Sequence, residues 1–235
     1  PAALYDNHNP QEVAIDSSTG FFGIDSQSFW SADEDGNVVE NGGAASKIPS
    51  ARKIYTNVAS GATISITDNA LSESNSLITK DLLGITSETD SYRTDLLKWA
   101  RGLDSNDAPR LQMGDPLHSR PELITYDGVS TTIESTIFYG TNEGFLHAID
   151  INTGIEQFAF IPKELLGNLN TYFVNASVDP RPYGLDGGLT LWSKDLNHDG
   201  DLKDTNEFAR LYAGMRRGGR NYYALDVTNV NSPQL

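Results

Sequence analysis

Hydrophobic and polar residues alternate in short runs through the second half of the chain, and turn residues separate the runs. Four such runs, rich in apolar and β-branched residues, cover residues 123–126, 132–139, 145–149 and 155–161. Each intervening turn carries Gly, where a backbone with positive φ is wanted. The pattern predicts short strands joined by tight hairpins in an antiparallel meander. A meander of about four strands is one blade of a β-propeller, and it also occurs in barrels and sandwiches.

A repeat within the chain favours the propeller among these folds. Residues 137–150 and 210–228 both contain an apolar strand, a Gly, a polar turn with further Gly, and then aromatic or apolar residues that lead to an Asp. Three pairs of residues correspond between the copies: Gly140 with Gly214, Ala148 with Ala224, and Asp150 with Asp226. The offset of 74 to 76 residues fits one blade plus an insertion.

The first half of the chain has a different composition. Ser, Asn, Asp and Gly are frequent there, and apolar residues form only short islands. Two segments are predicted to be helical: residues 76–83, which end before Gly84, and residues 88–101, with Ser87 as the N-cap. We therefore expect a mainly β fold, with an irregular connector of one or two helices at residues 1–105. Residues 106–235 would form the first blades of an incomplete propeller.

The charge of the chain narrows the classes of partner. The 235 residues carry 32 acidic and 17 basic side chains, which gives a net charge of −15 and a pI near 4.5. This charge disfavours nucleic acid, whose binding depends on attraction to phosphates, and adsorption to anionic membranes. No apolar run approaches the roughly 20 residues of a membrane span, and the lack of Cys excludes disulfides and thiol catalysis.

The stretch DLNHDGDLKD, residues 195–204, carries the clearest chemical signal. Its first, third and fifth positions are Asp195, Asn197 and Asp199, and Gly200 follows at the sixth. This is the opening of an EF-hand-type loop, in which alternate residues of a tight turn direct oxygen atoms at one Ca²⁺ ion. Asp201 at the seventh position would contribute its backbone carbonyl. The spacing predicts a calcium site in a loop between two strands.

The end of this loop departs from the EF-hand pattern. Lys203 at the ninth position has no side-chain oxygen, and Asn206 replaces the bidentate Glu at the twelfth. The loop must close through another residue, and we prefer Asp204 over Glu207 for this role. The alternative is a solvated, Asp-rich turn without an ion.

Two other charged groups are weaker candidates for binding sites. Residues 33–37 (DEDGN) have carboxylates at alternate positions and a Gly, as a calcium loop with fewer ligands would. A plain turn is the favoured interpretation of this segment. Four Arg residues lie within eleven positions: Arg210, Arg216, Arg217 and Arg220. They can form a docking patch for an acidic partner, because guanidinium groups bind carboxylates and phosphates. Pairing with nearby Asp and Glu, or stacking on Tyr222 and Tyr223, is the favoured interpretation.

Acid–base or metal chemistry has only a weak basis in the sequence. Asp115 and His118 are close in the chain, and His147 is on a predicted strand. Four scattered His in a chain of this length more often satisfy local hydrogen bonds than form a site. No Ser-His-Asp or paired-carboxylate constellation can be assembled, so no catalytic residue is predicted.

Four blocks of sequence carry a resemblance to a known family. They are residues 113–121 (MGDPLHSRP), 138–150 (FYGTNEGFLHAID), 158–166 (FAFIPKELL) and 209–228 (ARLYAGMRRGGRNYYALDVT). These blocks resemble the PilY family of type IV pilus tip-associated adhesins, at the start of their C-terminal domain. Residues 20–31, 41–57 and 96–104 are similar to the segment before that domain. The resemblance implies a modified, quinoprotein-like propeller with a calcium site, of which this chain would hold about two blades.

The resemblance also implies a biological role. A PilY-like protein would be secreted to the outer cell surface and the pilus tip. There it would act with minor pilins in type IV pilus biogenesis and twitching motility, and would attach to a host or abiotic surface without catalysing a reaction. Because the chain begins at Pro1 rather than Met, we interpret it as a segment of a longer protein.

Two alternative functions stay open. Residues 140–154 resemble the blade signature of quinoprotein dehydrogenases, which suggests an enzyme, although a shared fold is weak evidence of activity. The other alternative is a purely structural calcium-binding module. An assay with pyrroloquinoline quinone and an alcohol would separate the enzyme from the other two hypotheses.

Overall fold

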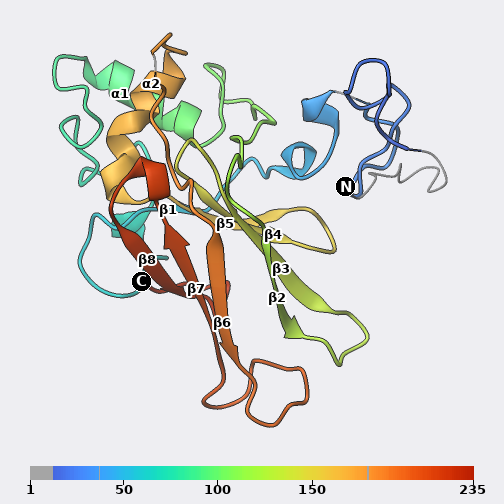
Figure 1. Cartoon of the computed structure of the whole chain (residues 1–235). Helices are drawn as coiled ribbons and strands as arrows, with labels where there is room; N and C mark the ends of the chain where they lie inside the picture. Colours follow the sequence, from blue (N-terminus) through green and yellow to red (C-terminus); the bar gives the residue numbers. More distant parts are fainter. Residues whose placement is uncertain (1–12, 37, 179) are drawn as a thin grey trace.

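The computed structural model describes residues 13–36, 38–178 and 180–235. Strands account for 24% of the described residues and helices for 15%, so the prediction of a mainly β fold is confirmed. Figure 1 shows two sheets that extend toward the bottom of the molecule, with α1 (Asp90–Ala100) and α2 (Leu169–Phe173) together at the top left. Within the described residues, no helix is both long enough and apolar enough to cross a membrane.

The first sheet has five strands in the order β1-β5-β4-β3-β2. Their bounds are β1 (Ile54–Tyr55), β2 (Glu122–Asp127), β3 (Glu134–Gly140), β4 (Leu146–Asp150) and β5 (Glu156–Phe160). β2 to β5 form an antiparallel meander, as the hydrophobic pattern predicts, and β1 adds in parallel to β5. Each predicted strand is present with its ends shifted by no more than a few residues.

The second sheet repeats this arrangement with the same register. It contains β6 (Leu189–Lys194), β7 (Phe208–Gly214) and β8 (Tyr222–Asp226) in antiparallel order. In the first sheet Asp150 lies opposite Thr136, four residues before Gly140, and in the second Asp226 lies opposite Arg210, four residues before Gly214. The two copies of the repeat are therefore equivalent hairpins in separate sheets, which is the arrangement expected of consecutive propeller blades.

One segment of the first half runs along the outer edges of both sheets. Beside β5, Ala159 and Ile161 donate backbone hydrogen bonds to the carbonyls of Lys53 and Tyr55, at 2.9 Å each. Further along, the backbone of residues 62–64 bonds to residues 233–235, and Gln234 in turn bridges to Asp226 at the end of β8. Residues 53–64 thus connect the two sheets along their rims.

The two sheets share one hydrophobic core. Phe138, Phe158 and Phe160 of the first sheet are almost completely buried, as are Leu211 and Leu225 of the second. Complete burial of a side chain of this size contributes about 1.5–3 kcal/mol to stability. The core therefore holds the two sheets together as one unit.

Helix α1 is present where the pattern predicts it, but its cap is different. Thr89, rather than Ser87, is the N-cap, and its hydroxyl accepts a hydrogen bond from the backbone N–H of Tyr92 at 3.1 Å. The remaining helical segments are single 3₁₀ turns or slightly longer: η1 (Val39–Asn41), η2 (Ala45–Lys47), η3 (Thr67–Asn69), η4 (Lys163–Asn168) and η5 (Arg216–Gly218).

The prediction of a helix at residues 76–83 is wrong, because this segment forms turns. Arg93 of α1 explains the difference. Its guanidinium donates hydrogen bonds to the backbone carbonyls of Glu73, Asn75 and Ile78, at 2.9, 2.6 and 2.9 Å. Carbonyls engaged with a side chain from another element are drawn away from a helical ladder.

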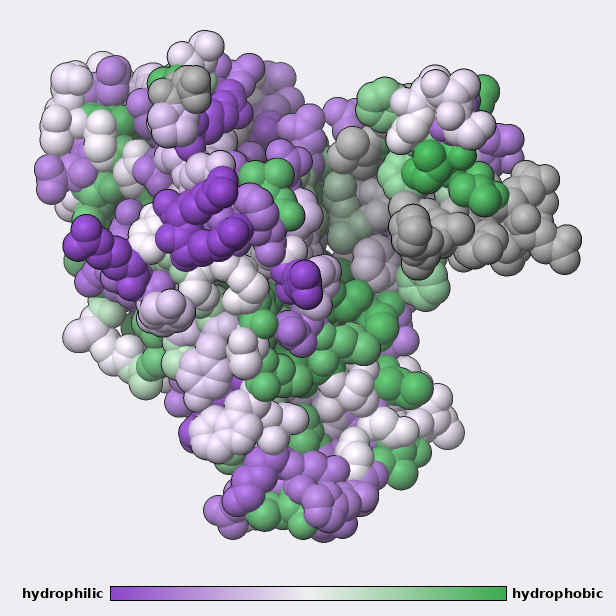
Figure 2. Space-filling view, viewed as in Figure 1, coloured by the Kyte–Doolittle hydropathy of each residue, from purple (hydrophilic) through white to green (hydrophobic). Residues whose placement is uncertain are grey.

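Residues 13–36 and 38–50 form a lobe to the right of the sheets in Figure 1. Trp30 attaches it to the first sheet, because its indole N–H donates to the carbonyl of Ile151 at 2.8 Å. Gly154 accommodates this contact: its φ is 71°, and a Cβ there would lie 2.7 Å from the Trp30 ring. Figure 2 shows hydrophobic side chains on the lobe, where Phe21 and Ile24 are 70% and 87% exposed.

A buried ion pair attaches the chain to the first sheet directly before residues 53–64, which we call the edge segment. Arg52 Nε and Nη2 donate to the two carboxylate oxygens of Glu156 at 2.6 and 2.8 Å, and Glu156 also pairs with His147 Nδ1 at 2.7 Å. Burial alone would raise the pKa of Glu156, but the charge and hydrogen bonds of Arg52, together with His147, outweigh it and lower the pKa to about 2. The folded structure therefore stabilises the ionised form of the Glu156 carboxylate.

We expect Arg52→Met to lower the free energy of unfolding by about 3–5 kcal/mol at neutral pH, because Glu156 would be left buried without its cation. The folded pKa of Glu156 lies below the ordinary value of 4.5, so this stabilisation is complete above pH 4.5 and is lost as the pH falls toward 2. The stability gap between wild type and variant should therefore narrow over that range in urea titrations.

Lys98→Met is the matched control, since the Lys98–Asp107 pair is partly exposed and should contribute less than about 1 kcal/mol. Equal losses in the two variants, or a gap that does not change between pH 5 and pH 2, would contradict this account.

Candidate metal centre

The predicted calcium loop, residues 195–204, lies in the connection between β6 and β7. Lys194 pairs with Phe208 as the last pair of this hairpin, so the loop leaves from a closed ladder. It hangs below the sheets in Figure 1, and the same end of the molecule is largely hydrophilic in Figure 2. The strands predicted on either side of the loop are confirmed as β6 and β7.

Asp195 closes the first turn of the loop through its carboxylate. Oδ1 accepts the backbone N–H of His198 at 2.6 Å, and Oδ2 accepts that of Gly200 at 3.0 Å. Gly200 has a φ of 84°, a conformation that glycine adopts without strain. The sharp turn predicted at the sixth position is therefore present, and the first-position carboxylate points into the loop.

The amide of Asn197 lies between two carboxylates. Its Nδ2 donates to Asp199 Oδ2 and to Asp204 Oδ2, at 2.9 Å each, while its Oδ1 accepts from the backbone N–H of Asp199 at 3.1 Å. A group with partial positive charge thus stands where two anionic oxygens meet. Rotation of the amide by 180° would present its oxygen instead, so that all three side chains could face a cation.

Asp201 is held in a short extended segment next to β2. The neighbours of Asp201 bond to β2, because Gly200 accepts from Gly128 N–H at 3.0 Å and Leu202 donates to the Tyr126 carbonyl at 2.8 Å. The N–H and carbonyl of Asp201 therefore point to the opposite side, and the N–H donates to Asp199 Oδ1 at 2.9 Å. This orientation suits the Asp201 carbonyl as a ligand, while its carboxylate accepts from Lys203 N–H at 2.8 Å.

Glu207 is buried at the base of the loop. Its Oε1 accepts the backbone N–H of Leu196 at 2.7 Å, and Glu207 is only 7% exposed. Oε2 is buried and has no hydrogen-bond partner within the described residues. A buried carboxylate oxygen without a donor is costly, and an ion at the loop is one way to satisfy it.

The donor set of the loop consists only of oxygen atoms, the ligands that Ca²⁺ prefers. In the part of the chain that the structure describes, no three His, Cys, Asp or Glu side chains are grouped so as to hold a metal ion. Asp195, Asp199 and Asp204 of the predicted set are therefore not gathered around one point in this structure. The residues fit an ion that binds as the Asn197 amide turns and the carboxylates close around it.

In the second candidate loop, residues 33–37, the buried carboxylate of Asp35 accepts hydrogen bonds from nearby serine residues. Asp35 accepts hydrogen bonds from the Ser28 N–H at 3.0 Å and from the hydroxyls of Ser28 and Ser31. Burial would raise the pKa of Asp35, but these hydrogen bonds together lower it. Asn37 lies outside the described residues. The contacts agree with the favoured interpretation of a plain turn.

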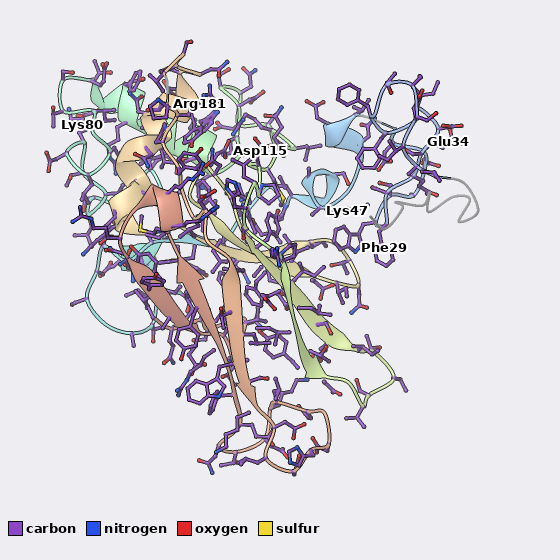
Figure 3. All side chains as sticks on the ribbon, viewed as in Figure 1. Phe29, Glu34, Lys47, Lys80, Asp115 and Arg181 are labelled. Atoms are coloured by element: carbon purple, nitrogen blue, oxygen red, sulfur yellow. The ribbon has the colours of Figure 1, made fainter. Side chains whose placement is uncertain are left out.

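The candidate acid–base residues are distributed over different contacts. His118 Nδ1 pairs with the buried carboxylate of Asp186 at 2.7 Å, and Arg216 Nη1 lies 3.5 Å from the other oxygen of Asp186. Asp115 is labelled in Figure 3 in the upper part of the molecule, far from the loop at the bottom. His147 belongs to the buried Arg52–Glu156 pair. The structure does not bring Asp115, His118 and His147 together.

The Arg cluster is mostly engaged within the chain. Arg210 lies 3.6 Å from Asp226 and stacks over the ring of Phe208. Arg217 Nη1 donates to the hydroxyl of Tyr183 at 3.0 Å. These contacts support local pairing, although the aromatic partners are not the predicted Tyr222 and Tyr223.

Sequence reasoning missed the Arg52–Glu156–His147 network. Its three members are distant in the sequence, and Arg52 stands in a polar segment without regular pattern. The one available signal is Glu156 at the head of an apolar strand, where an acidic residue requires a partner if it is buried.

Comparison with known proteins gives relatives for parts of the chain. A type IV pilus biogenesis factor PilY1 homolog of Xylella fastidiosa is 36% identical over 101 residues, which are 42% of this chain and 8% of the relative. PilY1 of Pseudomonas aeruginosa is 25% identical over 166 residues, which are 62% of this chain and 14% of the relative. The chain thus spans a small part of the length of these proteins.

A lanthanide-dependent methanol dehydrogenase of Methylorubrum extorquens is 43% identical over 56 residues, 23% of this chain and 9% of the enzyme. No family model matches the chain, and no solved structure matches it significantly. The short dehydrogenase match agrees with a propeller-like relation of the two sheets. The PilY1 matches, of which one covers 62% of the residues at 25% identity, support a PilY1-family region in this chain.

Proposed function

We propose that this chain is the calcium-binding part of a type IV pilus biogenesis factor that acts at the cell surface without catalysing a reaction. Similarity to PilY1 proteins supports the pilus role. The observation that carries the calcium role is the Asn197 amide between the carboxylates of Asp199 and Asp204, at the position that a cation would take.

The proposed ligands are the side chains of Asp195, Asn197, Asp199 and Asp204 and the backbone carbonyl of Asp201. With Asp195 and Asp204 as the ends, they span one tight loop that Gly200 allows to turn. Asp204 closes the site, because its Oδ2 already shares a donor with Asp199. Glu207 positions the loop through Leu196 N–H, and its Oε2, which has no partner among the described residues, makes it the second choice after Asp204 for closing the site.

Charge explains why the ion would matter for stability. Four Asp residues lie within ten positions, and their mutual repulsion opposes the closed loop in the absence of a cation. A divalent ion would remove much of this repulsion. At a calcium concentration about 100 times the dissociation constant, binding to the folded state alone contributes about 2.7 kcal/mol.

We expect calcium to raise the melting temperature by roughly 5–10 °C, because each kcal/mol shifts a chain of this length by about 2–4 °C. Asp199→Asn should abolish most of this rise, since it removes a charged ligand while keeping an acceptor for the Asp201 N–H. Calorimetric titration and thermal unfolding, each in chelator and in calcium, measure the two effects.

Asp81→Ala is the control, because Asp81 is an exposed carboxylate in a turn far along the chain from the loop. It should leave the calcium response intact. Unchanged calcium affinity in Asp199→Asn would overturn the assignment of the loop.

The proposed role in pilus biogenesis concerns the whole parent protein, of which this chain is a part. PilY1 relatives are named as pilus biogenesis factors, and the acidic, mainly β chain fits a component exposed outside the cell. We propose secretion to the pilus tip, contact with minor pilins, and attachment to a host or abiotic surface. Twitching motility would depend on these activities.

Deletion of the parent gene should therefore reduce surface pili and twitching, and the wild-type gene should restore both. A gene that carries Asp199→Ala should restore them less completely if the ion is needed for the role. Counts of surface pili by electron microscopy and twitching zones on agar measure the outcome, and normal piliation in a clean deletion would contradict the proposal.

A quinoprotein-type dehydrogenase is the second candidate, because a methanol dehydrogenase matches 56 residues of this chain with 43% identity. The described residues form no catalytic constellation that we can identify, so this candidate rests on the match alone. Oxidation of an alcohol by the parent protein after loading with pyrroloquinoline quinone would favour it. The absence of turnover would leave the pilus role as the better account.

A further inference from the structure

The loop that carries the proposed calcium site is also a junction between the two sheets. Gly128, in the turn after β2, donates its N–H to the Gly200 carbonyl at 3.0 Å, and Leu202 donates to the Tyr126 carbonyl at 2.8 Å. Asp127 and Asp201 lie opposite each other between these bonds as an antiparallel pair. The loop of the second sheet therefore forms a short ladder with the end of the first.

Side chains extend this contact on both sides of the ladder. Lys203 Nζ lies 2.8 Å from Glu134 Oε2 and 3.7 Å from Asp127 Oδ2, and its hydrogen bond with Glu134 raises the pKa of Lys203. Leu202 is 6% exposed and belongs to the hydrophobic core. The contact thus combines backbone bonds, an apolar anchor and one cation.

The same residues belong to the ladder and to the loop. Gly200 accepts from Gly128 through its carbonyl while its N–H donates to Asp195 Oδ2. Asp201 lies opposite Asp127 on one side, and its N–H bonds to Asp199 on the other. The backbone of residues 200–202 bonds to β2 and the turn after it on one side and to the acidic side chains on the other. A rearrangement of the acidic side chains therefore also affects the hydrogen bonds to β2.

Charge makes this junction sensitive to a cation. The charged and titratable groups around it are Asp127, Glu134, Asp195, His198, Asp199, Asp201, Lys203 and Asp204. Lys203 is the single Lys or Arg among them, against six carboxylates. Repulsion between the loop and the end of β2 therefore opposes their contact, and a divalent ion in the loop would reduce it.

We infer that calcium in the loop controls how firmly the two sheets are docked at this end, so that the ion acts as a clamp between neighbouring blades. The inference rests on the proposed calcium site and adds to it a mechanical consequence. Binding at the loop and docking on β2 are coupled, and each must strengthen the other.

Hydrogen exchange followed by mass spectrometry on the full 235-residue chain tests the clamp. Calcium should slow exchange in peptides that contain Gly128 and Leu202 by about tenfold, within the usual range of coupling between sites. The turn amide of Gly144, which donates to Thr141 at 3.0 Å at the other end of the first sheet, serves as the internal control and should change little. Asp199→Asn should remove the response at both peptides.

The outcomes separate the clamp from the calcium site. Calcium binding by calorimetry with no slowing at residues 126–134 would overturn the clamp and leave the site standing. The absence of calcium binding would overturn both. Equal slowing at Gly144 and Gly128 would show general stabilisation of the fold and would likewise overturn the clamp.

Discussion

The unpaired edges of the two sheets are the constraint on which the rest of this structure depends. An open edge leaves backbone N–H and carbonyl groups without partners and invites unwanted pairing. Residues 53–64 cover the outer edge of the first sheet through Lys53 and Tyr55, and they continue to the rim of the second at residues 62–64. The buried Arg52–Glu156 pair lies directly before this segment and attaches it to β5 of the first sheet.

The edge segment and the acidic loop hold the sheets at different places. Residues 53–64 join the sheets along one edge, and the loop joins β2, the strand at the opposite edge of the first sheet, to the β6–β7 connection through Gly128 and Leu202. Between them lies the shared core of Phe138, Phe158 and Leu211. The core and the rim contacts need no ion, whereas the loop carries a concentration of negative charge. The proposed calcium ion would therefore stabilise the contact between the loop and β2 rather than the fold as a whole.

Local signals in the sequence predicted much of this arrangement. The strands β2 to β8 follow from short apolar runs between turn residues, and the equivalent register of Asp150 and Asp226 follows from the repeat. Contacts between distant segments could not be predicted in this way. The two-residue strand β1 has no pattern of its own, and Arg93 bonds to the Ile78 carbonyl from a different part of the chain, within residues 76–83. Likewise, the spacing of the loop residues indicates a calcium site but says nothing of its docking on β2.

The central claim is that one calcium ion binds within residues 195–204, and a luminescent lanthanide tests it most directly. Trp192 of β6 precedes the loop by three residues and can transfer excitation energy to Tb³⁺ bound there. The account predicts sensitised terbium emission that saturates at one equivalent, is displaced by calcium, and is lost in both Asp199→Asn and Trp192→Phe. Emission that persists at full strength in Asp199→Asn would contradict it.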